Sequence, residues 1–217
     1  MFSHKHDIPA EHPLHYEWKH NIAIPTLKEM GYDVHIVKGK EDYLSIFNKR
    51  YKRSENPNKI GKKWGFMIAS TCSLKRYCKI LAMDSWCKKQ GDFHKILGYA
   101  YDEKKRIESM LKTPNVSSTL YDLKIKERET FDICRPYNLL SPIYDTKNRD
   151  GCWFCPNQSV EQMARFAKEY PQYWALLEEL AKDPDLASQN FRFGETFAQV
   201  NQQIKIINSQ ISIFEIM

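Results

Sequence analysis

"HKILGYAYD", residues 94–102, is the stretch that decides the predicted fold. It is a short run of apolar and aromatic residues that ends in a polar turn, a pattern that predicts a buried strand. Helical patterns lie on both sides of it, over residues 73–91 and residues 124–138. Helices that alternate with single short strands are typical of an α/β fold with a mainly parallel sheet. We therefore predict an α/β protein.

The N-terminal part of the chain is predicted to hold a helix, a strand and a second, short helix. Apolar residues recur at helical spacing over residues 11–30, where Pro25 is expected to kink or split the helix and Gly31 to end it. Residues 32–39, "YDVHIVKG", alternate as a short strand does, and residues 41–50 have the pattern of a short helix.

The C-terminal part is predicted to be mostly helical. "LLSPIYD", residues 139–145, is expected to be extended, because a proline restricts the residue before it. Ser159 and Gln162 form the signature of a capping box, which predicts a long helix over residues 160–182. We expect residues 1–158 to form the α/β domain and residues 159–217 to form a helical extension packed on it.

The positive charge of the chain is concentrated in one stretch. Residues 48–63 hold seven basic residues and one acidic residue, a charge of +6 that equals the net charge of the whole chain. Such a stretch attracts polyanions, so nucleic acid or a ribonucleoprotein is the expected partner, and a solvated loop is the alternative. The candidate polyanion-binding residues are Lys49, Arg50, Lys52, Arg53, Lys59, Lys62 and Lys63.

Composition indicates a globular protein. The 217 residues are 42% hydrophobic and 13% aromatic, and they contain no apolar run long enough to span a membrane. The N-terminal residues have no signal-peptide shape, so we expect a cytoplasmic protein without a membrane partner. The six cysteines are then not expected to form a disulfide framework.

Four of the six cysteines occur as two pairs. Cys72 and Cys78 lie in "STCSLKRYCKI", and Cys152 and Cys155 lie in "GCWFCP". Two such pairs separated by a long insertion are a common way to build a four-sulfur site, because zinc and iron prefer soft thiolate ligands. Spacing does not decide between zinc and an iron–sulfur cluster. The alternative interpretation is a redox pair or a core turn at "CWFC", with Cys78 packed in a helix. The two remaining cysteines, Cys87 and Cys134, are predicted to be core residues.

Three segments, in their order along the chain, resemble one family. "TCSLKRYCKI", "HKILGYAYDEKKRIESML" and "LLSPIYDTKNRDGCWFCPN" look like the phosphoadenosine phosphosulfate (PAPS) reductase family of the adenine nucleotide alpha hydrolase-like superfamily, and most like its phage and mobile-element branch. The similarity runs over residues 11–200. It implies that the four paired cysteines are metal or cluster ligands. It also implies that the anionic end of a nucleotide would lie near Lys75, Arg76, Lys79 and Arg106.

The chain departs from this family in two ways. The family's Ser-Gly-Gly-Lys-Asp-Ser phosphate loop is missing, and the chain begins at what resembles the end of the family's second strand. The resemblance therefore implies an N-terminally truncated remnant of a doubly wound, mainly parallel sheet, whose exposed edge could pair with a second copy of the chain. True reductases use a cysteine near the chain end, whereas no cysteine follows Cys155 here. No catalytic residue is predicted.

The family resemblance, together with the missing phosphate loop and the missing C-terminal cysteine, leads to two candidate functions. The first is a non-catalytic, phage-type binding protein that inhibits a host nucleoprotein, in the manner of anti-defence or anti-CRISPR proteins. The alternative is a nucleotide-dependent PAPS reductase-like or sulfur-transfer enzyme with a zinc or iron–sulfur site. A third interpretation is a true start codon that lies upstream, with the phosphate loop encoded there.

Overall fold

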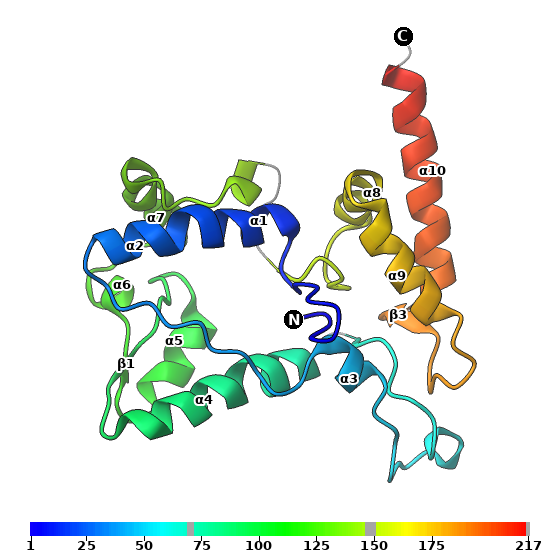
Figure 1. The fold of residues 1–217 in the computed structure, drawn as a ribbon, viewed down its shortest axis with the longest axis horizontal. Coiled ribbons are helices and arrows are strands. Elements are labelled where there is room, and N and C mark those ends of the chain that lie inside the picture. The colour runs from blue at the N-terminus through cyan, green and yellow to red at the C-terminus, as the bar shows by residue number, and fades with distance from the viewer. Residues whose placement is uncertain (69–71, 146–150, 216–217) are drawn as a thin grey trace. The chain divides into compact units, whose positions relative to one another are not determined.

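The computed structural model describes residues 1–68, 72–145 and 151–215, and it describes side chains as far as residue 210. It is a mixed helix and strand structure, about 52% helical, with only small sheets (Figure 1). The chain divides into two compact units, each made of more than one segment. The first unit comprises residues 1–13, 38–82 and 149–217, and the second comprises residues 14–37 and 83–148.

The first unit is built from a short N-terminal helix, a pair of turns and a C-terminal group of three helices with a hairpin. The predicted boundary between residues 158 and 159 lies inside this unit. Its elements are α3 (Tyr43–Phe47), η2 (Pro57–Lys59), η3 (Lys75–Ile80), the start of α4 (Leu81–Cys87), α8 (Val160–Glu169), α9 (Pro171–Ala181), β3 (Asn190–Arg192), β4 (Glu195–Thr196) and α10 (Phe197–Glu215).

An aromatic core holds the segments of the first unit together. Phe2, Phe47, Trp153 and Phe166 are each at most 1% exposed. Phe2 lies 4.8 Å from Trp153 between ring centroids, and Trp153 stacks on Phe166 at 5.6 Å. The N-terminal residues therefore share one core with the "CWFC" turn and with α8, although these segments are about 150 residues apart in sequence.

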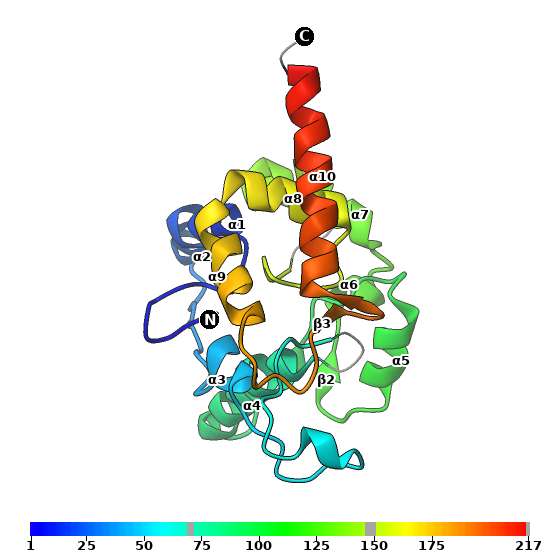
Figure 2. The same ribbon diagram turned by 90° about the vertical axis from the view of Figure 1, so that its right-hand side faces the viewer.

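Helix α10 packs on α8, and its C-terminal turns extend beyond α8 and α9 (Figures 1 and 2). Val200 and Ile204 of α10 are buried, and the Asn208 amide donates to the carbonyl of Ala164 in α8 at 3.2 Å. The predicted capping box is confirmed, because the Gln162 amide N–H donates to the Ser159 hydroxyl at 3.2 Å and the Gln162 side chain accepts in return.

The predicted long helix over residues 160–182 is wrong in one respect, because it is two helices. Helix α8 ends at Glu169 and α9 begins at Pro171. Proline has no N–H to donate and restricts the residue before it, and Tyr170 accordingly has a non-helical backbone with φ of −131° and ψ of 60°. Pro171 instead occupies the first turn of α9, where its missing N–H costs nothing.

The second unit is mostly helical, with one small parallel sheet. Its elements are α1 (Pro13–Trp18), η1 (Lys19–Ala23), α2 (Ile24–Glu29), the end of α4, η4 (Lys88–Gln90), β1 (Lys95–Ile96), α5 (Lys104–Leu111), β2 (Val116–Ser117), α6 (Thr119–Asp122), α7 (Glu127–Cys134), η5 (Arg135–Tyr137) and η6 (Pro142–Asp145). Among these residues, β1 pairs in parallel with β2, and α5 connects them, so the three elements form a βαβ unit.

The predicted helix over residues 11–30 is confirmed, with a π-helical turn inside it. Residues Lys19–Ala23 form this turn, and the Ile24 N–H donates to the carbonyl of Lys19, five residues back. The turn ends two residues before Pro25, whose ring would clash with the preceding turn of a regular α-helix. Gly31 ends the helical segment with φ of +89°, as its position in the sequence indicated.

Two strand predictions are wrong. Residues 32–39 form no ladder with any described segment, and the Ile36 side chain is 57% exposed. The predicted buried strand over residues 94–102 is reduced to Lys95–Ile96, and Ile96 is 68% exposed. An alternation of apolar and polar residues indicates a strand only when another part of the protein covers the apolar face. The sequence of the segment itself does not reveal that other part. A doubly wound parallel sheet is not seen in the described residues.

Residues 142–145 are also different from the prediction. They form the short 3-10 helix η6, not an extended segment, because the Ser141 carbonyl accepts from the Tyr144 N–H at 3.2 Å. Residues 146–150, which belong to the stretch that carries the family resemblance, lie outside the described residues. No helix in the described part of the chain is long and apolar enough to cross a membrane.

Candidate functional site

The "CWFC" turn is fixed to the rest of the first unit by hydrogen bonds. The Cys155 N–H donates to the Cys152 carbonyl at 3.0 Å, which closes the turn. The Trp153 ring N–H donates to the Pro9 carbonyl at 2.9 Å, and its backbone N–H donates to the Ala10 carbonyl at 3.1 Å. The Gln158 amide donates to the carbonyls of Cys152 and Trp153, at 3.0 Å each. These bonds hold the two thiols in place from both sides of the turn.

Three of the four paired cysteines line one small pocket. Cys72 approaches the pocket from the residues that precede η3, and Cys152 and Cys155 approach it from the turn. Met67 and the buried Tyr43 also line it. The pocket has a volume of about 30 Å³, which is room for one or two groups the size of a water molecule. Three thiols and one thioether therefore line one small pocket, together with apolar side chains such as Phe154 and Phe191.

Cys78 does not line this pocket. It lies in the π-helical turn η3, where its backbone packs against Gly39. Burial raises the pKa of the Cys78 thiol to about 11, and its charged neighbours are the N-terminal amine, Asp42, Glu41 and Lys49. None of the other three paired cysteines is among these neighbours.

Cys152 shares one charged neighbour, the N-terminal amine, with Cys78, and its other neighbours differ. Burial raises the pKa of the Cys152 thiol to about 12, the Lys79 ammonium group opposes this rise, and the Cys155 and Cys72 thiols add to it. Within the described residues, no group of three or more His, Cys, Asp or Glu side chains is arranged to hold a metal ion as it stands. The four-cysteine centre thus stays a prediction, of which the structure brings three members to one pocket.

The residues expected to bind an anionic nucleotide group fall into two sets. Lys75, Arg76 and Lys79 are exposed side chains of η3, in the first unit. Arg106 belongs to α5 in the second unit, where it pairs with Glu103 at 2.6 Å and lies 5.6 Å from the Tyr99 ring. Only the first three are brought together within one unit.

The basic stretch forms an irregular hairpin, which we call the basic arm and define as residues 49–64. The Tyr51 N–H donates to the Lys62 carbonyl at 3.0 Å, the Gly61 N–H donates to the Tyr51 carbonyl at 2.9 Å, and the Trp64 N–H donates to the Lys49 carbonyl at 2.7 Å. The arm projects from the first unit, in cyan in Figures 1 and 2.

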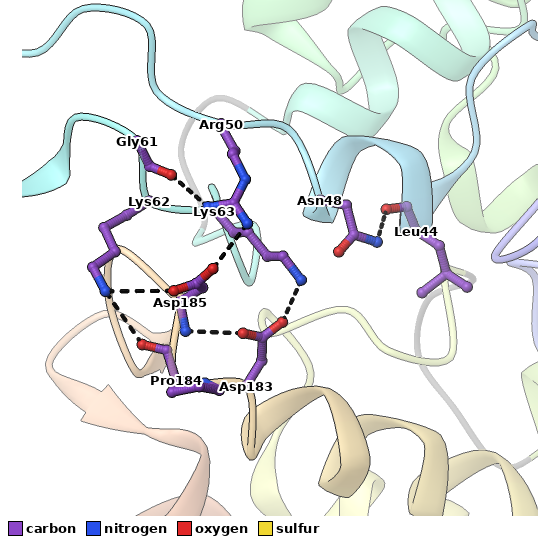
Figure 3. A network of polar contacts seen from close by, with 9 residues as sticks. All are labelled: Leu44, Asn48, Arg50, Gly61, Lys62, Lys63, Asp183, Pro184 and Asp185. Atoms are coloured by element: carbon purple, nitrogen blue, oxygen red, sulfur yellow. Dashed lines mark hydrogen bonds and ion pairs between the residues drawn. The ribbon is translucent and has the colours of Figure 1, made fainter.

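Acidic residues neutralise the base of the arm (Figure 3). Arg50 pairs with Asp185 at 2.8 Å, and Lys63 pairs with Asp183 at 2.6 Å. Lys62 lies 3.7 Å from Asp185. The hydrogen bonds from Lys63 and Arg50 lower the pKa values of Asp183 and Asp185 respectively, so both carboxylates stay charged. The loop between α9 and β3 therefore holds the arm in place.

The sequence analysis missed these two aspartates. They lie about 120 residues after the arm, and a count of charges over a local window does not include them. Lys49 is paired as well, with Glu41 at 2.8 Å. Of the seven basic candidates, the described part of the chain offers no ion pair to Lys52, Arg53 and Lys59. The cations without an ion pair thus lie at the outer end of the arm, where the exposed Glu55 reduces the formal charge of these residues from +3 to +2.

Aromatic rings line the base of the arm and continue onto η3. Tyr51 lies 6.0 Å from Trp64, and Trp64 lies 6.5 Å from Tyr77 of η3. The Lys49 ammonium group lies 4.4 Å from the Tyr77 centroid and 5.8 Å from that of Trp64. The Arg76 guanidinium carbon lies 6.0 Å from the Tyr77 centroid. Cations and aromatic rings thus alternate over one side of the first unit.

Comparisons with models of protein families, with curated proteins and with solved structures found no match to this chain.

Proposed function

We propose that the chain is a PAPS reductase-like, non-catalytic binding protein of the cytoplasm, a phage-type inhibitor that docks on a host nucleoprotein. The observation that carries the proposal is the basic arm. Its base is fixed by Asp183 and Asp185, while Lys52, Arg53 and Lys59 have no carboxylate partner in the described residues. A rigid stem with uncompensated cations at its outer end suits a partner whose surface is rich in phosphate.

The test of this proposal is a charge reversal in the arm. The triple variant Lys52→Glu, Arg53→Glu, Lys59→Glu is compared with the parent for RNA binding across a salt series. Affinity should fall at least about tenfold at low salt, and the slope of log affinity against log salt should flatten, because each lost phosphate contact removes about one released counterion.

A matched control makes the same change of charge elsewhere. Lys88, Lys89 and Lys112 are exposed cations of the second unit. Reversing these three should leave both the affinity and the salt slope near those of the parent. If both triple variants lose binding equally, the arm has no special role and binding reflects net charge alone.

We further propose that the first unit is stabilised by a thiolate metal centre. Cys72, Cys152 and Cys155 are the ligands that the pocket supports, and Cys78 is the fourth ligand that the family resemblance implies. The pocket volume of about 30 Å³ favours a single zinc ion over an iron–sulfur cluster. A centre of this kind would link residues of η3 to the "CWFC" turn and add its binding energy to folding.

Metal analysis of protein purified without oxygen tests the centre. One zinc per chain and a colourless solution are expected, and a brown solution with iron would mean a cluster. Cys152→Ser should abolish metal binding and lower the melting temperature, whereas Cys134→Ser, which changes a half-buried cysteine of the second unit, should not. If removal of the metal left the melting temperature of the parent protein unchanged, the proposal would be contradicted.

We also propose that the chain contains the remnant of a doubly wound sheet, and the βαβ unit is the observation that supports this fold. A parallel pair joined by a helix is the building block of a doubly wound sheet, and β1–α5–β2 is such a pair. The edge at Ile96, 68% exposed, is where a second copy of the chain could pair to form a homodimer. Sedimentation of the parent and of Ile96→Lys would test this, because a charge on the edge should leave only monomer.

A second candidate is an enzyme of the same family, a nucleotide-dependent reductase or sulfur-transfer protein. One observation favours it: η3, which carries the cations Lys75, Arg76 and Lys79, begins three residues after Cys72, which lines the same pocket as Cys152 and Cys155. Calorimetric titration with ATP or PAPS distinguishes the two functions. The binding-protein proposal expects no micromolar affinity for either nucleotide.

A further inference from the structure

We infer that the basic arm and η3 form a binding platform for single-stranded nucleic acid, in which the rings of Tyr51, Trp64 and Tyr77 stack on bases. The inference rests on the proposed function, since it names which anionic polymer the arm takes. The inference adds base stacking to electrostatic attraction. A duplex and a simple polyanion offer anionic groups, but neither offers an unpaired base that could stack on a ring.

The rings have the placement that stacking requires. Tyr51, Trp64 and Tyr77 come from three different places, which are the rising strand of the arm, its returning strand and η3. Their centroids follow one another at 6.0 Å and 6.5 Å, and all three side chains are half-buried. Trp64 and Tyr77 pack against the core of the first unit and are anchored by it, and each of the three rings keeps part of its surface exposed. Successive bases of a single strand stack on rings of this kind.

Cationic side chains occur next to the three rings, either in sequence or in space. Lys52 and Arg53 follow Tyr51 and are exposed, while Arg76 lies beside Tyr77. Lys49 lies over Trp64 and Tyr77 and is neutralised by Glu41, so we assign it a structural role in orienting the rings. Stacking faces for bases and free cations for the backbone are the two elements of sequence-tolerant single-strand recognition.

An acidic protein surface would be attracted by the same cations but would not explain the rings. Carboxylates offer no π face, and the ring series would then serve packing alone. The charge of the platform is also suited to a polymer that is longer than one nucleotide, because the cations extend from the arm onto η3. We therefore commit to a single-stranded nucleic acid and treat the acidic protein as an outcome of the test.

The experiment compares four labelled polyanions on the full chain. These are a single-stranded RNA of about twelve nucleotides, its duplex, inorganic polyphosphate and polyglutamate, each measured by competition at one salt concentration. We expect the single strand to bind about tenfold or more tightly than polyphosphate of equal charge, with the duplex close to polyphosphate.

The variant that tests stacking is Tyr51→Leu, which keeps an apolar side chain but removes the ring. It should weaken single-strand binding about fivefold or more and leave polyphosphate binding unchanged. Tyr137→Leu, at a tyrosine that is 56% exposed in the second unit, is the matched control and should change neither. Trp64→Phe provides a second readout, because binding of bases should quench the fluorescence of the parent more than that of this variant.

The outcomes separate this inference from the proposed function. Equal affinity for single strand and polyphosphate, unchanged in Tyr51→Leu, overturns base stacking while binding of a polyanion stands. Preferential binding of polyglutamate overturns the nucleic acid in favour of an acidic protein. No binding of any of the four polymers overturns both the platform and the proposed function.

Discussion

Gly39 lies where the chain passes closest to the helical turn that carries Cys78. A β-carbon on Gly39 would stand 2.7 Å from the Cys78 carbonyl oxygen and 2.9 Å from its α-carbon. Both are backbone atoms of a helix, which cannot move aside as the end of a side chain can. We expect Gly39→Ala to cost about 1–3 kcal/mol in the free energy of unfolding, measured by urea denaturation.

Gly98→Ala is the control for that measurement. Gly98 has no atom within 4 Å of an added β-carbon and no positive φ. This variant should be neutral or slightly stabilising, because alanine reduces the entropy of the unfolded chain. If Gly39→Ala were equally neutral, the close approach of residues 38–40 to η3 would be wrong.

Asp183 provides a pH-dependent contribution at the base of the arm. Its pKa is lowered by the hydrogen bond from Lys63, so the stabilising pair is fully present above the ordinary carboxyl pKa and is lost as the pH falls through the lowered value. Asp183→Asn should therefore cost about 0.5–1 kcal/mol at pH 7, and the difference from the parent should disappear as the pH falls through the lowered pKa of Asp183. Asp122→Asn, which makes the same change of side chain at an exposed aspartate of the second unit, is the matched control.

In helix α10, the burial of a side chain determines how much that side chain contributes to the stability of the fold. Ile204 is 2% exposed and faces α8, whereas Ile206, two residues further along, is 50% exposed. Removing the side chain of a buried isoleucine leaves a cavity, so Ile204→Ala should cost about 2–4 kcal/mol, while Ile206→Ala should stay within about 0.5 kcal/mol. Urea midpoints of the two variants measure this, and equal midpoints would mean that α10 does not pack on α8.

The elements also show what a sequence can predict. The capping box at Ser159 and the helix end at Gly31 were predicted correctly, because both depend on residues within one turn. The break at Pro171 was missed, although its signal is local, since a proline inside a helical pattern restricts the residue before it.

Apart from the local 3-10 turn at residues 142–145, the remaining differences involve partners far away in sequence. Residues 32–39 and 94–102 have strand patterns, but what would pair with them is not encoded in those segments. Four of the seven basic candidates form ion pairs with carboxylates, three of them with residues of the loop between α9 and β3. Likewise, spacing groups Cys78 with Cys72, while packing against Gly39 keeps Cys78 off the pocket that Cys72 lines. Local patterns predicted the kind of site, and tertiary contacts decided which members share it.

The first unit as a whole depends on its N-terminal residues, since it is assembled from three segments of the chain. Phe2 is 1% exposed and lies 5.0 Å from Tyr43, 4.8 Å from Trp153 and 5.2 Å from Phe154 between ring centroids. Its ring therefore joins α3 to the "CWFC" turn. Phe2→Ala should cost about 3–5 kcal/mol and shift the emission of Trp153 towards longer wavelength, as water reaches the core. Phe193→Ala, at a side chain that is 92% exposed in the same unit, should change the free energy of unfolding by less than about 0.5 kcal/mol. Equal stability of the two variants would mean that the N-terminal residues are not part of the core.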